Sequence, residues 1–297
     1  MNTRNTHPQR LALALALLAA CGLAQAQDSG AGTSGKLLLT GGVSQVEGSA
    51  GGGLTPWAVI GGYGTRDQIG ANAFYTNVSV DDYTLDSYGV LVGFYDRVEL
   101  SFSRQEFDTE AVGGLLGLGN GFTFTQDTIG VKVKVAGDAV LEQDSWLPQI
   151  AVGAQYKKND QPGVLAFVGA RDDSGVDYYV SATKLYLAQS LLLNGTVRFT
   201  KANQFGILGF GGDQNDDYEA QFEASAAYLL SRNLAIGAEY RTKPNNLGIA
   251  DEDDAWDVFV AWAPIKNVSL TVAYVDLGNI VIRDEQRGVY ASLQVGF

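Results

Sequence analysis

The last ten residues of the chain alternate between apolar side chains and small or polar ones. A period of two places all the apolar side chains on one face of a β-strand. The same period recurs over residues 128–135, 234–241 and 268–274, so the sequence predicts an all-β fold whose strands each carry one apolar face. The apolar positions at the C-terminus are Val289, Ala291, Leu293, Val295 and Phe297.

Composition narrows the classes of protein further. The 297 residues include 37 Gly, 14 Tyr, 13 Phe and 4 Trp, which is too aromatic for a disordered chain and too rich in glycine for a helical bundle. Lys and Arg number 20 against 33 Asp and Glu, so the chain is poorly suited to neutralising phosphates. Nucleic acid is therefore not expected as a partner.

Residues 1–26 have the features of a signal peptide: a basic start, an apolar stretch over residues 11–20 and the cleavage site Ala24-Gln25-Ala26. We expect export with cleavage after Ala26, with lipidation at Cys21 as the alternative. Residues 27–35 are then a short periplasmic segment, and residues 36–297 a single β-barrel domain. Cleavage also removes the only His and the only Cys of the sequence.

After residue 26 there is no apolar run long enough for a membrane-spanning helix, so the alternating strands fit either a soluble sandwich or a transmembrane barrel. Aromatic residues at the strand ends favour the barrel, because membrane interfaces are enriched in Trp and Tyr. The expected aromatic girdle comprises Trp256, Trp262, Tyr218 and Tyr228.

Connection lengths support the same choice. Short turns alternate with long loops rich in Gly, Asp and Asn, as in outer-membrane barrels with short periplasmic turns and long extracellular loops. We predict an antiparallel up-and-down barrel of 14 strands, with 12 as the alternative because the first two are interrupted by glycine, and a bulge near Ala182. The predicted strands cover residues 36–44, 57–64, 69–77, 85–95, 98–107, 125–136, 148–158, 176–187, 191–201, 218–230, 234–242, 255–263, 267–276 and 288–297.

The terminal Phe297 and its alternating strand resemble the C-terminal signature of Gram-negative outer-membrane barrels, which implies recognition by the outer-membrane assembly machinery. The stretches at Lys36–Val43, Leu54–Tyr75, Thr200–Gly206 and Glu239–Asn246 resemble a proteobacterial outer-membrane family known only as a domain of unknown function. This resemblance implies the fold and the location in the outer membrane. It implies no activity and no site.

Charged residues on the polar strand faces are expected to line the lumen. A turn centred on Arg232 places Glu223 opposite Arg241, so ion pairs between strands either polarise an open pore or fill a narrow one. The candidates are Lys132, Lys134, Lys157, Arg198, Glu219, Glu223, Glu239 and Arg241.

The long loops fall into two classes. Acidic loops, such as residues 251–254, are either solvated or bind cations that bridge lipopolysaccharide, the expected partner together with the bilayer lipids. Apolar, Gly-rich loops are expected to fold inward and to gate the lumen or plug it. The gate candidates are Leu115, Leu116, Leu118, Phe205 and Phe210.

Catalysis is not expected. Without His or Cys the mature chain has neither a Ser-His-Asp triad nor a Cys-His pair, and no nucleotide-binding motif is present. We expect no cofactor and no metal. The predicted function is a passive channel for small solutes, hydrophobic ones in one reading, and the alternative is a closed structural, adhesive or assembly barrel.

Overall fold

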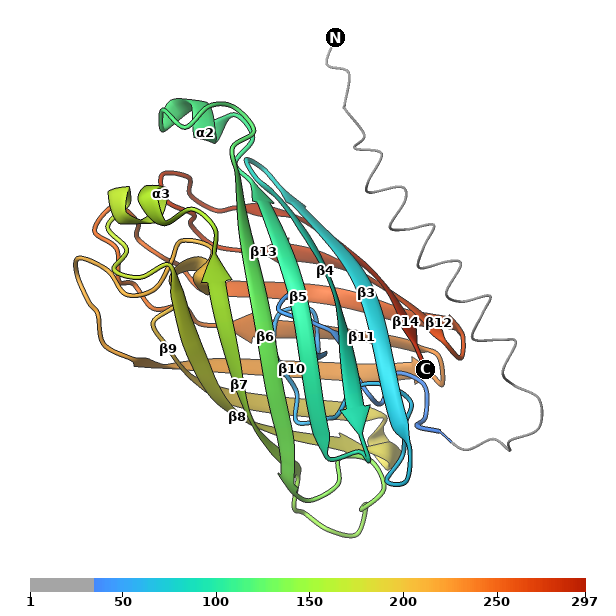
Figure 1. Ribbon diagram of the computed structural model, residues 1–297. Coiled ribbons are helices and arrows are strands. Elements are labelled where there is room, and N and C mark those ends of the chain that lie inside the picture. Colours follow the sequence, from blue (N-terminus) through green and yellow to red (C-terminus); the bar gives the residue numbers. More distant parts are fainter. Residues whose placement is uncertain (1–34) are drawn as a thin grey trace.

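The computed structural model describes residues 35–297, and most of them form a closed ring of antiparallel strands, each paired with its neighbours in sequence (Figure 1). Strand β14 pairs with β3 and closes the ring. The twelve wall strands are β3 (Ile69–Val80), β4 (Thr84–Phe94), β5 (Val98–Asp108), β6 (Thr123–Ala136), β7 (Gln149–Asn159), β8 (Ser174–Tyr186), β9 (Leu191–Thr200), β10 (Glu219–Ser231), β11 (Leu234–Arg241), β12 (Ala255–Ile265), β13 (Val268–Asp276) and β14 (Arg287–Gly296).

The wall strands turn their apolar side chains outward. In β12, Val258 and Val260 are 46% and 42% exposed, whereas Asp257 on the opposite face is 1% exposed. The period of two in the sequence therefore separates an outer apolar surface from a polar interior, as the barrel prediction requires.

The connections differ between the two ends of the barrel. One end, called here the turn end, carries residues 95–97, 187–190, 232–233 and 266–267, and a longer connection at 137–148. The other, called the loop end, carries long connections that include helices α2 (Val112–Leu115) and α3 (Pro162–Phe167) (Figure 1). An even strand count brings the first wall strand and the C-terminus to the turn end. Across residues 35–297, every helix is too short to cross a bilayer.

The ring has twelve strands, which confirms the all-β barrel and the alternative count of twelve; the first choice of fourteen is wrong at its first two strands. Residues 36–44 and 57–64 lie outside the wall, and only the two-residue strands β1 (Val43–Ser44) and β2 (Ala50–Gly51) form there. Every residue from 43 to 62 is buried, and Figure 1 shows this stretch, in blue, inside the ring. A strand of this wall needs one face toward the outside, and a segment buried on all sides has none.

The predicted bulge near Ala182 is also absent, because β8 keeps one register with both of its neighbours. Its Lys184 is buried by the connection 137–148, where its Nζ donates hydrogen bonds to the carbonyls of Glu142 (2.5 Å) and Leu147 (3.2 Å). Leu185, on the other face, packs inside the barrel. Covering Lys184 and packing Leu185 inside make a register change unnecessary.

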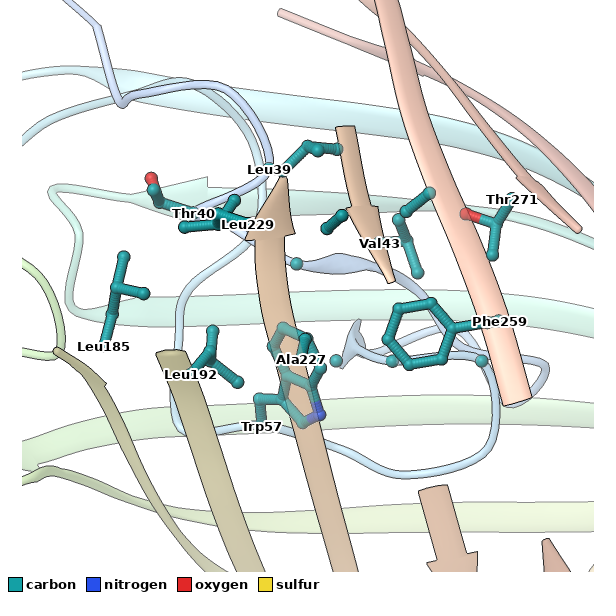
Figure 2. Close-up of a pocket in the computed structure, with 16 residues that line it drawn as sticks. Leu39, Thr40, Val43, Trp57, Leu185, Leu192, Ala227, Leu229, Phe259 and Thr271 are labelled. Carbon is teal, nitrogen blue, oxygen red and sulfur yellow. The ribbon is translucent and has the colours of Figure 1, made fainter. Parts of the chain in front are cut away.

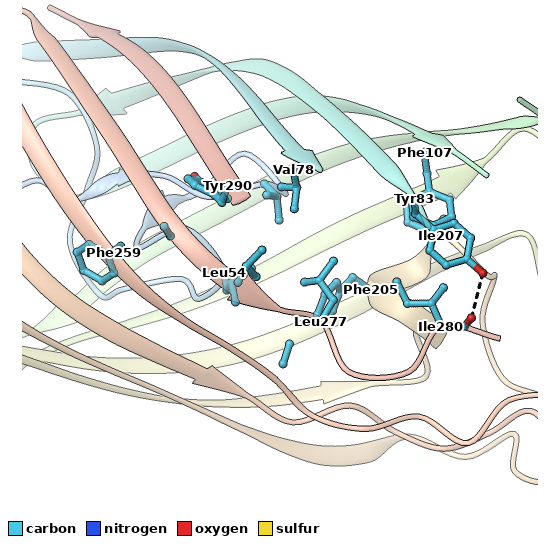
Figure 3. Close-up of a cluster of buried hydrophobic side chains, with 14 of the residues drawn as sticks. Leu54, Val78, Tyr83, Phe107, Phe205, Ile207, Phe259, Leu277, Ile280 and Tyr290 are labelled. Carbon is cyan, nitrogen blue, oxygen red and sulfur yellow. Dashed lines mark hydrogen bonds between the residues drawn. The ribbon is translucent and has the colours of Figure 1, made fainter. Parts of the chain in front are cut away.

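The interior also contains apolar layers. Toward the loop end, Tyr83 stacks on Phe107 with ring centroids 5.1 Å apart, and its hydroxyl donates a hydrogen bond to the Ile280 carbonyl at 3.1 Å (Figure 3). Ile207 and Phe205 join this layer from a loop. The barrel therefore has a packed interior.

Candidate functional site

The buried residues 43–62, called here the lumen segment, pass through the barrel without joining its wall. The segment is rich in glycine because its backbone runs against wall side chains. At Gly52 a Cβ atom would lie 1.9 Å from Oε1 of Glu239, closer than any non-bonded contact allows. Only glycine fits there without displacing a wall carboxylate.

Glu47 is the only charged residue of the lumen segment, and it is fully buried in a cluster of cations. Arg241 contacts both carboxylate oxygens, Nη1 to Oε2 at 2.9 Å and Nη2 to Oε1 at 3.2 Å. Lys157 donates a hydrogen bond to Oε1, and Nη2 of Arg198 lies 3.6 Å from Oε2. A two-pronged contact of this kind is the strongest that arginine makes with a carboxylate.

The cluster arises because β7 to β11 each turn one charged side chain inward at the same level. Asp177 accepts from Lys157 at 2.7 Å and from Arg198 at 3.2 Å. Glu223 lies opposite Arg241 in the register, as predicted, and contacts both arginines. We call Lys157, Arg198 and Arg241, with these two wall carboxylates, the Glu47 cradle.

The charges of the cradle balance only when Glu47 is present. Its wall carries three cations and two carboxylates, and Glu47 supplies the third negative charge. Burial alone would raise the pKa of Glu47, but Arg241, Lys157 and Arg198 outweigh burial and hold that pKa well below its usual range. Glu47 is therefore ionised in the closed barrel.

A second wall pair holds the backbone of the lumen segment. Glu99 and Lys132 face each other on β5 and β6, 3.1 Å apart. Glu99 accepts from the amides of Ala50 (3.0 Å) and Gly61 (2.8 Å), while Lys132 donates to the carbonyls of Ala50 and Val59, both at 2.8 Å. This pair satisfies backbone groups that a strand would pair with a neighbouring strand.

Glu239 and Ser225 provide a third anchor. Glu239 accepts from the Leu54 amide at 2.8 Å, and the Thr55 hydroxyl lies 2.6 Å from the Ser225 hydroxyl. The indole nitrogen of Trp57 donates to the same Ser225 oxygen at 2.9 Å. The segment is therefore bound at several points by polar groups of the wall.

Toward the turn end, the contact between the segment and the wall is apolar. A cavity of about 30 Å³ remains there, and Figure 2 shows Trp57 of the segment and Phe259 of β12 on it, together with Leu185 and Leu192. A space of this size holds only one or two water molecules. A wider cavity of about 430 Å³, lined by residues that include Lys36, Asp96 and Asp138, lies at the turn end.

The predicted gate residues divide into two groups. The loop between β9 and β10 folds into the barrel through helix η2 (Asn203–Gly206), so Phe205 and Phe210 are buried. The Phe205 ring lies 4.1 Å from the guanidinium of Arg241 and covers the cradle on its loop-end side. In the loop 109–122, by contrast, Leu115 is 66% exposed, and Leu116 and Leu118 are partly exposed.

The predicted lumen residues also divide. Two of them lie at the mouths: Lys134 pairs with Asp96 at the turn end, and Glu219 accepts from Asn215 at the loop end. The other six are buried inside the barrel and contact the lumen segment or the cradle: Lys132, Lys157, Arg198, Glu223, Glu239 and Arg241.

The four residues of the expected girdle, Trp256, Trp262, Tyr218 and Tyr228, are 37–49% exposed on the outer face of the wall. Phe297 hydrogen-bonds to Ala71 of β3 through its backbone, its amide donating at 2.8 Å. The signal peptide and the lipidation site lie outside the described residues.

Glu47 is the candidate functional residue that the sequence did not lead us to predict. Its position as the lone charge in a Gly-rich apolar stretch could have indicated it.

The sequence between residues 40 and 294 matches one family, described as "Protein of unknown function (DUF3034)". The chain belongs to this family. No curated protein matches it.

Several solved structures align with this chain at low sequence identity. The KdgM porin aligns over 76% of this chain and 99% of its own, with 11% identity and a TM-score of 0.50. The NanC porin aligns over 77% and 98%, with 11% identity and a TM-score of 0.47. Outer membrane phospholipase A from Escherichia coli aligns over 79% and 93%, with 11% identity and a TM-score of 0.42. The DUF3034 chain has the fold of an outer-membrane β-barrel.

Residues 35–297 contain no group of three or more acidic, His or Cys side chains arranged to hold a metal ion. Carboxylates of the acidic loops accept hydrogen bonds from their own loop or from a neighbouring one. Asp213 accepts from the Gly248 amide at 2.7 Å, and Asp251 accepts from the Asn245 side chain at 2.8 Å.

Proposed function

We propose that this protein is a channel for small solutes that is closed at rest by the lumen segment. Opening consists of a displacement of residues 43–62 toward the turn end, from which the segment enters the barrel, and of the Phe205 ring, which covers the cradle at the loop end. The observation that carries the proposal is that the segment fills the lumen while contributing no strand to the wall.

The wall does not depend on the segment for closure. Strands β14 and β3 pair over nine positions, from Gly288 with Val80 to Gly296 with Asn72, so the ring of backbone hydrogen bonds survives when the segment moves. Barrels close because a free strand edge in a membrane is costly, and no edge is created here.

Displacement of the lumen segment would expose an inner wall surface whose central part is charged and can be hydrated. Buried Lys132, Lys157, Arg198 and Arg241 would face an aqueous lumen, where charges cost far less than in a packed core. A barrel with only a structural role gains nothing from so many buried charges, since apolar packing of the same volume is at least as stable. The apolar wall around Phe259 extends the proposal to solutes with a hydrophobic part.

We propose no catalytic activity. Residues 35–297 contain neither His nor Cys, the residues on which the common nucleophile-activating arrangements depend. Of the buried carboxylates, Glu99 and Glu239 accept hydrogen bonds from the lumen segment, and Glu47 pairs with cations.

A permanently closed barrel with a structural or adhesive role is the second candidate. The same ion pairs that make the lumen polar also hold the segment in place, and breaking a buried pair costs about 3–5 kcal/mol if no water replaces the partner. The two candidates differ in one respect: only the channel needs the segment to move.

A disulfide staple tests that movement. Replacing Thr55 and Ser225, whose hydroxyls are 2.6 Å apart, with Cys would tether the segment to β10. The matched control joins two wall strands at Thr76 and Ser292, whose hydroxyls are 2.8 Å apart. In planar bilayers we expect conductance steps from the wild type and the control. The tethered protein should be silent until a reductant is added. Silence of the wild type and of the reduced tethered protein would favour the closed barrel.

A further inference from the structure

The Glu47 carboxylate lies in a site built by the wall. Every cation that surrounds it belongs to a barrel strand, and the segment contributes the carboxylate and one backbone carbonyl, that of Leu54, which accepts from Nη1 of Arg241 at 3.0 Å. Such an arrangement is a carboxylate-binding site whose present occupant happens to be attached to the same chain.

From this geometry we infer that the Glu47 cradle is the solute-binding site of the open channel and that it takes small carboxylates, with Glu47 as a tethered competitor. The inference rests on the proposed function. It adds the substrate class and explains what releases the segment, because a carboxylate that occupies the cradle removes the strongest contact of Glu47.

The charge of the empty cradle supports a monoanion. Without Glu47 the wall there keeps Lys157, Arg198 and Arg241 against Asp177 and Glu223, which leaves one positive charge in excess. A single carboxylate restores neutrality, whereas a cation would add to the excess. The two wall carboxylates also hold the cations in place, so the site stays organised without its occupant.

The cradle retains one unused donor. Nη2 of Arg198 is buried and finds no hydrogen-bond acceptor among residues 35–297, since Oε2 of Glu47 stays 3.6 Å away. The segment backbone is fixed by Glu99 and Glu239, which restricts how far Glu47 can reach. A free carboxylate is not tethered and can approach all three cations.

Chemical rescue tests the site. Glu47→Ala removes a fragment equivalent to acetate, so sodium acetate is the probe. Acetamide, which has the same shape and no charge, is the matched control. In detergent we expect acetate to raise the melting temperature of the Glu47→Ala protein above its value in sodium chloride at equal ionic strength. Acetamide should have no effect on either protein. Acetate should affect the wild type much less than the variant, because in the wild type it must first displace Glu47.

Two further variants locate the effect. Adding Arg241→Met to Glu47→Ala should weaken acetate binding about tenfold or more, because a charge-assisted hydrogen-bonding pair is lost. Adding Lys132→Met removes an equally buried cation whose partners are Glu99, Ala50 and Val59, so acetate binding should persist. Equal responses to acetate and acetamide, or binding that ignores Arg241, would overturn the inference.

A folding defect also decides the question. If Glu47→Ala does not fold in chloride, recovery of the folded barrel in acetate and not in acetamide supports the site, and failure in both overturns it. Because these measurements need no conductance, they separate the two proposals. If the protein binds acetate but gives no conductance in bilayers, only the channel proposal is contradicted. If it conducts but does not bind acetate, only the proposed carboxylate site is contradicted.

Discussion

The lumen segment and the loop 109–122 are similar in composition, but one is buried and the other is largely exposed. Both are rich in glycine and apolar residues and both lack regular strands. The lumen segment is completely buried, whereas the loop stands beyond the strands at the loop end with Leu115 two-thirds exposed (Figure 1).

Their hydrogen bonds account for the difference. Side chains of the wall form hydrogen bonds with the backbone of the lumen segment. Glu99, for example, accepts a hydrogen bond from the Ala50 amide. The backbone of the loop bonds within the loop, as in the contacts of the Leu118 and Gly119 amides with the Gly113 carbonyl. An irregular segment can therefore be buried in a barrel only where wall side chains replace the backbone hydrogen bonds that a paired strand would make.

Deletion should separate the two regions most strongly. Removing residues 43–62 should leave a folded barrel whose conductance exceeds that of the wild type, with Phe205 as the remaining cover of the cradle, because the ring of wall strands is complete without them. Removing Gly114–Gly119 should leave the conductance of the wild type, because α2 lies outside the ring. Both proteins are compared in planar bilayers after heat-dependent gel mobility has verified folding. An open loop-deletion protein would restore Leu115, Leu116 and Leu118 as gate residues.

A charge placed on either face of β13 should distinguish the wall from the segment. Val272 is 55% exposed on the outer face, so Val272→Arg should lower the free energy of unfolding by about 2–4 kcal/mol in liposomes. Thr271 lines the small cavity beside the lumen segment, so Thr271→Arg should leave the wall folded and displace the segment. Urea titration and bilayer conductance measure the two effects. Equal loss of folding in both proteins would contradict this assignment of faces.

How far the sequence could predict the structure depends on periodicity. Strands with an alternating pattern, such as residues 268–274, were placed correctly. Glu223 pairs with Arg241 as predicted, although the turn beside Arg232 differs from the predicted one, with Ser231 paired to Leu234 after a bulge. Residues 36–44 and 57–64 were misassigned because their apolar character alone does not distinguish a wall strand from a segment outside the wall, whether partly exposed like Leu37 or buried inside the barrel like Trp57. The six buried lumen residues were recognised by the face they occupy, whereas Glu47 depends on contacts far away in sequence.

Two glycines with equal crowding should respond differently to substitution. At Gly51 a Cβ atom would lie 2.0 Å from the backbone oxygen of Thr55, and at Gly114 it would lie 2.0 Å from Oδ1 of Asn120. The first neighbour is fixed backbone, and the second is the end of an exposed side chain that can rotate away. Gly51→Ala should destabilise the buried state of the lumen segment by about 1–3 kcal/mol, seen as increased protease cleavage or conductance. Gly114→Ala should leave cleavage and conductance unchanged. Equal effects would mean that the lumen segment adapts as freely as the loop.

Acidification should weaken the binding of the lumen segment to the wall and leave the loop 109–122 unaffected. The pKa of Glu47 is held low in the closed barrel and returns toward its ordinary value of 4.5 once the segment leaves the cations. A lowered pKa stabilises the closed state fully above pH 4.5, and this contribution is lost as the pH falls below that value. The open probability should therefore rise below pH 4.5, by up to about tenfold per pH unit for one proton. Asp177 and Glu223 share the cations of the cradle with Glu47, so Glu47→Gln serves as the reference. If this variant keeps the full pH response, a group other than Glu47 controls the segment.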